Sequence, residues 1–135
     1  MMKYSMAHTC IKVSCLQESL AFYRQALHLQ EKGRIQCGRT VLVYLGDEAG
    51  SVYELELNCQ LSHEGRYQLG ENPGHFAFCV DDYEASLALH QQMQCVRLVS
   101  QEHGIYFISD PDGYIIEILP EGHHSVTERR NLHED

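Results

Sequence analysis

The stretch from His75 to Met93 reads HFAFCVDDYEASLALHQQM, and it repeats an earlier stretch that begins at His8 and reads HTCIKVSCLQESLAFYRQAL. At a constant offset of 67 residues (75 − 8 = 67), His8 falls on His75 and Val13 falls on Val80. Internal similarity of this kind indicates two copies of one supersecondary unit. The sequence therefore predicts a chain built by duplication.

The composition is typical of an ordinary globular protein, because 135 residues with 44% hydrophobic side chains are enough for one domain with a buried core. The net charge of −9 would repel a phosphate backbone, so we expect no nucleic-acid partner. The six cysteines stand singly without a C-x-x-C pair, which is typical of reduced thiols in a cytoplasmic protein. No secretory signal and no run long enough to span a membrane is present, so we expect a soluble, cytoplasmic protein.

The first copy begins with an alternating segment, AHTCIKV, at residues 7–13. Alternation with a period of two predicts a strand, and it separates two sets of side chains. One face carries Thr9, Ile11 and Val13, and the other carries His8, Cys10 and Lys12.

A helix over residues 15–28 is predicted next, because Ser14 and Gln17 have the spacing of a capping box and apolar residues recur at helical intervals. Three β-prone runs follow, at 29–36, 39–46 and 51–58, and the first two enclose a tight hairpin at Cys37–Gly38. The first module, residues 7–58, is therefore predicted to be βαβββ.

The second module, residues 75–120, repeats this order after a polar linker at 59–74. Its predicted elements are a strand at 75–80, a helix from Asp81 to about 93, and strands near 95–99, 104–109 and 113–119. The polar tail, 121–135, is expected to be loosely ordered or a short exposed helix. The predicted fold is α+β, with two tandem βαβββ modules in a single domain covering residues 1–135.

Each module offers one histidine on its first strand and one glutamate on its last. Glu54 corresponds to Glu117 at an offset of 63 (117 − 54 = 63), with the difference from 67 placed in loops. Two imidazoles and two carboxylates on rigid strands suit a divalent metal such as Ni²⁺, Co²⁺, Zn²⁺, Fe²⁺ or Mn²⁺. Glu56 lies on the same strand face and competes with Glu54, but only Glu54 has its counterpart in Glu117, so Glu54 is preferred as the ligand and Glu56 is the alternative.

These residues fall in recognisable motifs, and over nearly its whole length the chain resembles the vicinal oxygen chelate superfamily and, within it, glyoxalase I. The matching motifs are His8-Thr9, Ser19-Leu20-Ala21-Phe22-Tyr23, Glu54-Leu55-x-x-Asn58, Tyr67-x-Leu69-Gly70, Gly74-His75 and Asp110-Pro-Asp-Gly-Tyr114-x-x-Glu117. The last motif marks the superfamily, whereas Glu-Leu-x-x-Asn together with both histidines is more specific for glyoxalase I.

The resemblance implies a metalloenzyme in which one divalent ion is held by His8, Glu54, His75 and Glu117. It implies isomerisation of the hemithioacetal of methylglyoxal and glutathione to lactoylglutathione through an enediolate, as part of methylglyoxal detoxification. Glu117 would act as the base and Glu54 would assist it, while Lys12 and Asn58 would bind the glutathione part of the substrate. Nickel or cobalt is favoured, with zinc as the alternative, and a homodimer that shares its sites between subunits is implied.

The chain departs from glyoxalase I in parts that would grip glutathione. Lys12 replaces an arginine, which keeps the charge but loses the bidentate geometry. The segment SQEHG, residues 100–104, is short and lacks the lysine-glycine segment of that family. The alternatives are therefore another metalloenzyme of the same architecture, such as an epimerase, a ring-cleaving dioxygenase or an antibiotic-modifying thiol transferase, or a non-catalytic module that binds a small molecule.

Overall fold

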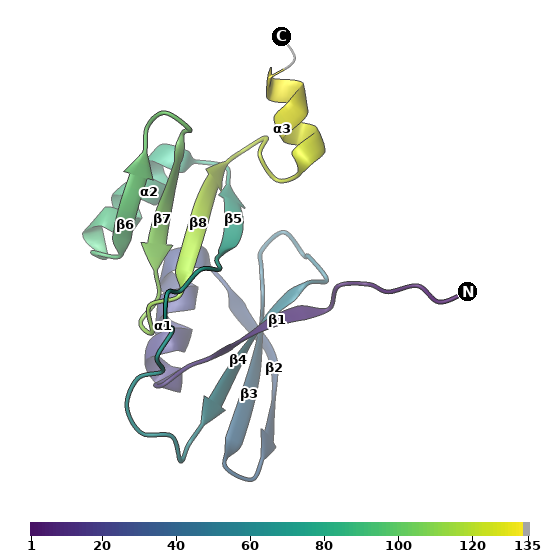
Figure 1. Ribbon diagram of the computed structural model, residues 1–135, viewed down its shortest axis with the longest axis vertical. Helices are drawn as coiled ribbons and strands as arrows, with labels where there is room; N and C mark the ends of the chain where they lie inside the picture. The colour runs from purple at the N-terminus through teal and green to yellow at the C-terminus, as the bar shows by residue number, and fades with distance from the viewer. Residues whose placement is uncertain (134–135) are drawn as a thin grey trace. The chain divides into compact units, whose positions relative to one another are not determined.

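The computed structural model describes residues 1–133 of the chain. Eight strands and three helices follow one another as two βαβββ series and a final helix (Figure 1). The first series is β1 (His8–Lys12), α1 (Leu16–Leu27), β2 (Gln30–Cys37), β3 (Thr40–Gly46) and β4 (Glu54–Gln60). The second is β5 (Phe76–Val80), α2 (Tyr83–Gln92), β6 (Val96–Ser100), β7 (Ile105–Ser109) and β8 (Ile115–Pro120), followed by α3 (Val126–His133).

Both series form a four-stranded sheet with the same topology. The strand order is β1-β4-β3-β2 in one sheet and β5-β8-β7-β6 in the other (Figure 1). In each sheet the first and last strands of the series pair in parallel, and the remaining neighbours are antiparallel. The predicted α+β fold of two tandem βαβββ modules is confirmed.

The chain divides into two compact units between Gln68 and Leu69, inside the predicted linker 59–74. The end of that linker is fixed to the second unit, since Asn72 Nδ2 donates a hydrogen bond to the Gly113 carbonyl over 2.9 Å. The linker is thus partly built into the second module. The grouping of both modules into one domain stays a prediction.

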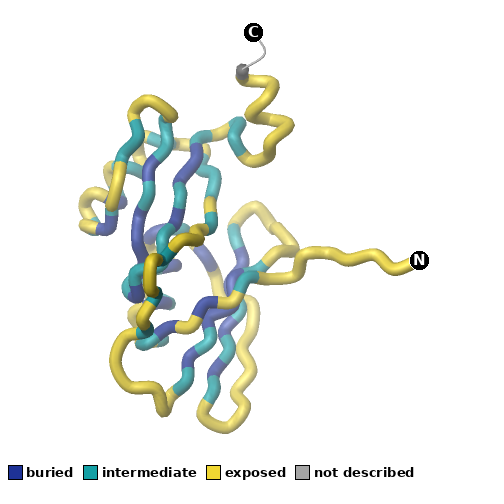
Figure 2. The backbone as a smooth tube through the Cα atoms, in the orientation of Figure 1, coloured by how far each residue is buried: buried dark blue, intermediate teal, exposed yellow. Residues whose placement is uncertain are grey.

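The buried apolar residues of the first unit follow the predicted alternation, although Glu56, on the polar face of β4, is buried as well. Ile11 and Val13 are buried, whereas the neighbouring His8, Cys10 and Lys12 are exposed. The same period of two buries further apolar side chains of β3 and β4, namely Val41, Val43, Leu45, Leu55 and Leu57. β2 is the outer strand of this sheet and is exposed along its whole length (Figure 2). The polar face of β1 therefore stays accessible while the apolar face contributes to the core.

The second unit encloses Ile108, Ile116 and Ile118 together with a buried polar network. The hydroxyl of Tyr106 lies 2.7 Å from His90 Nδ1 and 2.6 Å from Ser86 Oγ. His90 and Tyr106 are fully buried. Because buried polar groups are costly unless they are hydrogen-bonded, this network links α2 to the central strand β7.

The helix starts differ from the prediction by one residue. Cys15, and not Ser14, is the N-cap residue of α1, and the Cys15 side chain makes no capping hydrogen bond. In α2 the N-cap is Asp82 in place of the predicted Asp81, and its carboxylate accepts a hydrogen bond from the Ala85 amide. Both helix starts therefore lie one residue after the predicted capping residue, because the backbone conformation decides which of two neighbouring residues is the N-cap.

The C-terminal tail contains the short exposed helix that was one of its two predicted forms. Ser125 Oγ accepts a hydrogen bond from the Glu128 amide at the start of this helix, α3. In the part of the chain that the structure describes, no helix has the length and apolar character needed to cross a membrane.

Candidate metal centre

Parallel pairing brings the polar residues of β1 beside those of β4. His8 is opposite Glu54, Cys10 is opposite Glu56, and Lys12 is opposite Asn58. Paired residues of neighbouring strands point to the same face of a sheet, so these side chains form one polar surface of the first unit. The predicted ligands His8 and Glu54 and the predicted substrate-binding pair Lys12 and Asn58 thus share this surface.

The first half-site is formed by His8 and a carboxylate of β4. His8 Nε2 lies 3.7 Å from Glu56 Oε2, and the Tyr44 hydroxyl donates a hydrogen bond of 2.5 Å to Glu56 Oε1. The rings of His8 and Tyr44 meet edge to face with centroids 5.8 Å apart. Tyr44 belongs to β3 and lies opposite Glu56 in the sheet register. This half-site therefore takes one side chain from each of three adjacent strands.

The second half-site has the same plan in the other unit. His75 Nε2 lies 3.4 Å from Glu117 Oε1, and the His75 ring meets Phe107 edge to face with centroids 5.7 Å apart. Phe107 on β7 is opposite Glu117 on β8. His75 immediately precedes the first residue of β5. Each module therefore places an imidazole, a carboxylate and an aromatic ring together.

The turn before β8 positions Glu117. Asp110 Oδ1 accepts hydrogen bonds from the amides of Asp112 and Tyr114, at 3.0 and 2.8 Å. Gly113 has a φ of 97°, which favours glycine, and a Cβ there would lie 3.6 Å from a side-chain carbon of Leu69. The Asp-Pro-Asp-Gly motif is thus a structural turn that starts β8 at a fixed register with its neighbours.

The strand register assigns the two β4 carboxylates differently from the sequence offset. Glu117 pairs with Ala77 on β5 and with Phe107 on β7. Ala77 lies two residues after His75, as Cys10 does after His8. The residue of β4 that pairs with Cys10 is Glu56. Glu56 is therefore the structural counterpart of Glu117, and Glu54, which the sequence alignment had matched to it, lies directly opposite His8.

Burial alone would raise the pKa of the Glu56 carboxyl, but hydrogen bonds from Cys10 and Tyr44 and the nearby His8 outweigh it, so this pKa lies below its ordinary value. Burial and the Glu56 carboxylate raise the pKa of the Cys10 thiol to about 11. The hydrogen bond to Glu56, with burial, raises the pKa of Tyr44 to about 12. At neutral pH Glu56 is therefore a carboxylate, whereas the Cys10 thiol and the Tyr44 phenol are protonated.

The donor atoms of the two half-sites suit a divalent ion. The side chains of His8 and His75 are 41% and 46% exposed, so a ligand can reach their nitrogens, while the partner carboxylates are only 10% and 14% exposed. Imidazole nitrogen and carboxylate oxygen are ordinary donors for Ni²⁺, Co²⁺ and Zn²⁺. Among residues 1–133, no group of three or more histidine, cysteine or acidic side chains can hold an ion alone. Each module therefore offers one imidazole and one carboxylate close together.

Asn58 and Tyr44 add polar atoms to the surface of the first unit. The buried Oδ1 atom of Asn58 has no hydrogen-bond partner among the described residues, which suits a group that receives a substrate donor. The sequence singled out Asn58 but missed Tyr44. The alternation of β3, with Val43 and Leu45 buried and Tyr44 between them, contained the signal that Tyr44 faces the polar side.

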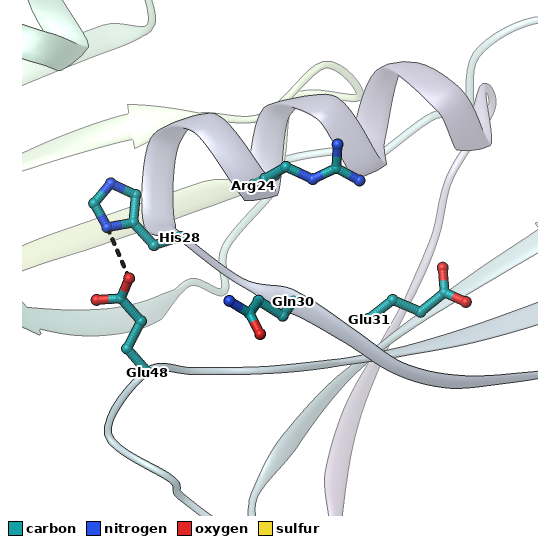
Figure 3. Close-up of a pocket in the computed structure, with 5 residues that line it drawn as sticks. All are labelled: Arg24, His28, Gln30, Glu31 and Glu48. Carbon is teal, nitrogen blue, oxygen red and sulfur yellow. Dashed lines mark ion pairs between the residues drawn. The ribbon is translucent and has the colours of Figure 1, made fainter.

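A surface pocket of about 450 Å³ lies away from these residues, at the C-terminal end of α1. Its lining residues are Arg24, His28, Gln30, Glu31 and Glu48, and none of them is a predicted site residue (Figure 3). In this pocket His28 Nδ1 lies 3.2 Å from Glu48 Oε1. The pocket is separate from the first half-site.

A family model described as Glyoxalase/Bleomycin resistance protein/Dioxygenase superfamily matches residues 5–118. The lactoylglutathione lyase of Neisseria meningitidis serogroup A (strain DSM 15465 / Z2491) is 39% identical over 122 residues, which cover 83% of this chain and 87% of that protein. The lactoylglutathione lyase of Escherichia coli O157:H7 is 31% identical over 127 residues, covering 84% and 90%.

Solved structures show the same relationship at the level of the fold. The trypanothione-dependent glyoxalase I of Leishmania major has a TM-score of 0.82 at 28% identity, over 98% of this chain and 97% of that one. The fosfomycin resistance protein of Mesorhizobium loti has a TM-score of 0.72 at 14% identity, covering 96% and 99%, which shows a shared fold alone. The predicted resemblance is confirmed, and the relatives are enzymes. The chain belongs to the lactoylglutathione lyase (glyoxalase I) family, within the glyoxalase/bleomycin resistance protein/dioxygenase superfamily.

Proposed function

We propose that this protein is a metal-dependent glyoxalase I that isomerises the hemithioacetal of methylglyoxal and glutathione to lactoylglutathione. The observation that carries the proposal is the repeated pairing of histidine with carboxylate, His8 with the acids of β4 and His75 with Glu117, in a chain 39% identical to a lactoylglutathione lyase. One divalent ion per site, nickel or cobalt with zinc as the alternative, would be held by His8, Glu54, His75 and Glu117.

A bound divalent ion would polarise the substrate oxygens and stabilise negative charge on them. The remaining chemistry belongs to the side chains. The Glu117 carboxylate removes the proton from C1 of the hemithioacetal; the electron pair of the broken C–H bond forms a C1–C2 double bond, and the C2 carbonyl pair moves onto its oxygen, which gives an enediolate. Glu117 then returns the proton to C2, the proton of the C1 hydroxyl passes to the C2 oxygen, and the C1 oxygen becomes the thioester carbonyl. Atoms and electrons balance, because the reaction is an isomerisation.

Glutathione would be bound by the polar surface beside the first half-site. Lys12 and Asn58 lie opposite each other in the β1–β4 register, four residues beyond His8 and Glu54 respectively. A lysine ammonium supplies charge for a carboxylate, and the unpartnered Asn58 oxygen supplies an acceptor.

The free state of all six cysteines supports a cytoplasmic location. In the homodimer that the resemblance implies, each ion would be held by one half-site from each subunit.

The first test measures lactoylglutathione formation from the hemithioacetal by the thioester absorbance, with apoprotein reloaded with Ni²⁺, Co²⁺ or Zn²⁺. Glu117→Gln should lower kcat by about 100-fold or more, because it removes the base and leaves the side-chain shape. Glu84→Gln, on the exposed surface of α2, is the matched control and should keep the activity. Metal-loaded wild-type protein without any lactoylglutathione formation would contradict the proposal.

The alternatives share this fold, and the departures at Lys12 and at the short β6–β7 loop favour testing them in the same series. Turnover of a fosfomycin-type epoxide or a 2-hydroxy acyl epimer in the absence of hemithioacetal turnover would establish another metalloenzyme. Tight binding of a small molecule without turnover of any substrate would establish a binding module.

A further inference from the structure

Basic side chains are few in the second unit. Its sequence has three arginines and no lysine, and the arginines are Arg97, Arg129 and Arg130. Arg97 belongs to the outer strand β6, and its Nε donates a hydrogen bond to Ser109 Oγ of β7 over 2.7 Å. The other two belong to α3, which follows β8 and lies beyond the end of that strand (Figure 1). A cation beside β5 and β8 would therefore have to come from α3.

Hydrogen bonds and packing within the tail fix the start of α3. Ser125 Oγ accepts a hydrogen bond from the Glu128 amide at 3.1 Å, and the Glu128 carboxylate accepts one from the His124 amide at 2.9 Å. This exchange is close to that of a capping box. A Cβ on Gly122 would lie 3.3 Å from a methyl carbon of Leu132, so the leucine packs against the glycine. The tail therefore holds α3 in one orientation.

The tail also contacts the strand face that carries Glu117. Cys79 of β5 pairs with Leu119 of β8, and Leu119 lies two residues beyond Glu117, so these side chains share one face. The Cys79 sulfur accepts a hydrogen bond from the His123 amide at the start of the tail. Leu119 is only 4% exposed, although it lies on the polar face of the sheet. The returning tail accounts for this burial and closes one end of the face.

Arg129 lies at this closed end. Its Nε donates a hydrogen bond to the His123 carbonyl over 3.1 Å, so its guanidinium is one residue away from the contact with Cys79. Burial and then the Glu128 carboxylate raise the pKa of the Cys79 thiol, and the Arg129 guanidinium lowers it. Glu128 is engaged by an amide at the helix start. Among the described residues, no carboxylate forms an ion pair with Arg129.

We propose, as an extension that rests on the function above, that the Arg129 guanidinium binds one carboxylate of the thiol component of the substrate. Glutathione has two carboxylates, and the proposed role of Lys12 accounts for one of them. The segment SQEHG, residues 100–104, has no basic residue that could bind the other. Arg129 supplies this second cation from the tail. A guanidinium suits the task because it can bind a carboxylate through two parallel N–H···O hydrogen bonds.

Calorimetric titration of S-methylglutathione into Ni²⁺-loaded protein measures this contact without turnover. Arg129→Gln should bind about 10-fold more weakly than the wild type, because a charge-assisted hydrogen bond is lost. Arg130→Gln is the matched control: it removes the same charge from the same helix, but adjacent helical residues point about 100° apart, so it should bind like the wild type. The diethyl ester of S-methylglutathione has no free carboxylate, and the wild type should bind it no better than Arg129→Gln does.

Wild-type affinity of Arg129→Gln for S-methylglutathione would overturn the inference. An equal loss of affinity for the acid and for the ester would overturn it too, since that loss would come from the fold of the tail. Lys12→Gln separates the two levels. Weaker binding in Lys12→Gln with normal binding in Arg129→Gln leaves the proposed function standing and removes the role of Arg129. Wild-type protein that neither binds S-methylglutathione nor turns over the hemithioacetal removes the proposed function, and this extension with it.

Discussion

The buried network around Tyr106 gives a quantitative test of what holds α2 to the sheet of the second module. Tyr106→Phe removes one oxygen and keeps the ring. That oxygen contacts His90 Nδ1 at 2.7 Å and Ser86 Oγ at 2.6 Å, and both Tyr106 and His90 are fully buried. The substitution therefore deletes two buried hydrogen bonds while leaving the packing of the ring unchanged.

A hydrogen bond contributes about 0.5–1.5 kcal/mol net, and a buried group that loses a partner costs about 1–3 kcal/mol. We expect Tyr106→Phe to lower the free energy of unfolding by about 2–3 kcal/mol. Unfolding entropy is roughly 2.1 cal/mol/K per residue, so for a chain of 135 residues this corresponds to a Tm lower by roughly 7–11 °C.

Urea and thermal denaturation of the apoprotein, followed by circular dichroism, measure both quantities. Tyr83→Phe is the control, because the Tyr83 ring contacts Tyr106 at a centroid distance of 5.4 Å but lies outside the network. Tyr83→Phe should change stability by less than about 1 kcal/mol. Equal stability of the two variants would refute the idea that the network, rather than ring packing, holds α2 to β7.

The same tyrosine predicts that stability depends on pH. Burial raises the pKa of Tyr106 to about 12 from an ordinary value near 10. Tyr106 therefore ionises first in the unfolded chain, and the free energy of unfolding falls as the pH rises from about 10 to 12. Urea unfolding across this range should show wild type losing about 2–3 kcal/mol more than Tyr106→Phe, and parallel curves would contradict the prediction. Asp110→Ala removes the acceptor of the Asp112 and Tyr114 amides and should lower the free energy of unfolding, measured in urea, by about 1–3 kcal/mol. The control Asp81→Ala, at an exposed position, should leave it nearly unchanged. Equal effects of the two substitutions would show that the turn does not depend on the Asp110 carboxylate.

Much of the fold followed from the repeat and from hydrophobic alternation. The faces of β1 were predictable because a strand alternates strictly, so the burial of Ile11 and Val13 leaves His8 exposed on the other side. Helix starts were less predictable, because adjacent residues such as Asp81 and Asp82 can both cap a helix and only the backbone decides between them.

The carboxylates of β4 show what a sequence alignment leaves out. An offset of 63 residues matches Glu54 to Glu117 by their motifs, whereas strand pairing matches Glu56 to Glu117. Pairing depends on where each ladder begins relative to its neighbour, and two glutamates on one face of a strand satisfy the same pattern of alternation. Choosing between them requires the register.

Duplication supplies two similar pairs of histidine and carboxylate, but the proposed isomerisation requires different roles of the two carboxylates. One acid would stay on the ion, and another would remove a proton from one carbon and deliver it to the next. The two modules have the same backbone register for Cys10 and Ala77, Glu56 and Glu117, and Tyr44 and Phe107. Cys10 and Tyr44 both hydrogen-bond the Glu56 carboxylate, whereas Ala77 and Phe107 carry no polar side-chain group at the matching positions beside Glu117. Corresponding carboxylates of the two modules are therefore held differently, although the backbone register around them is the same.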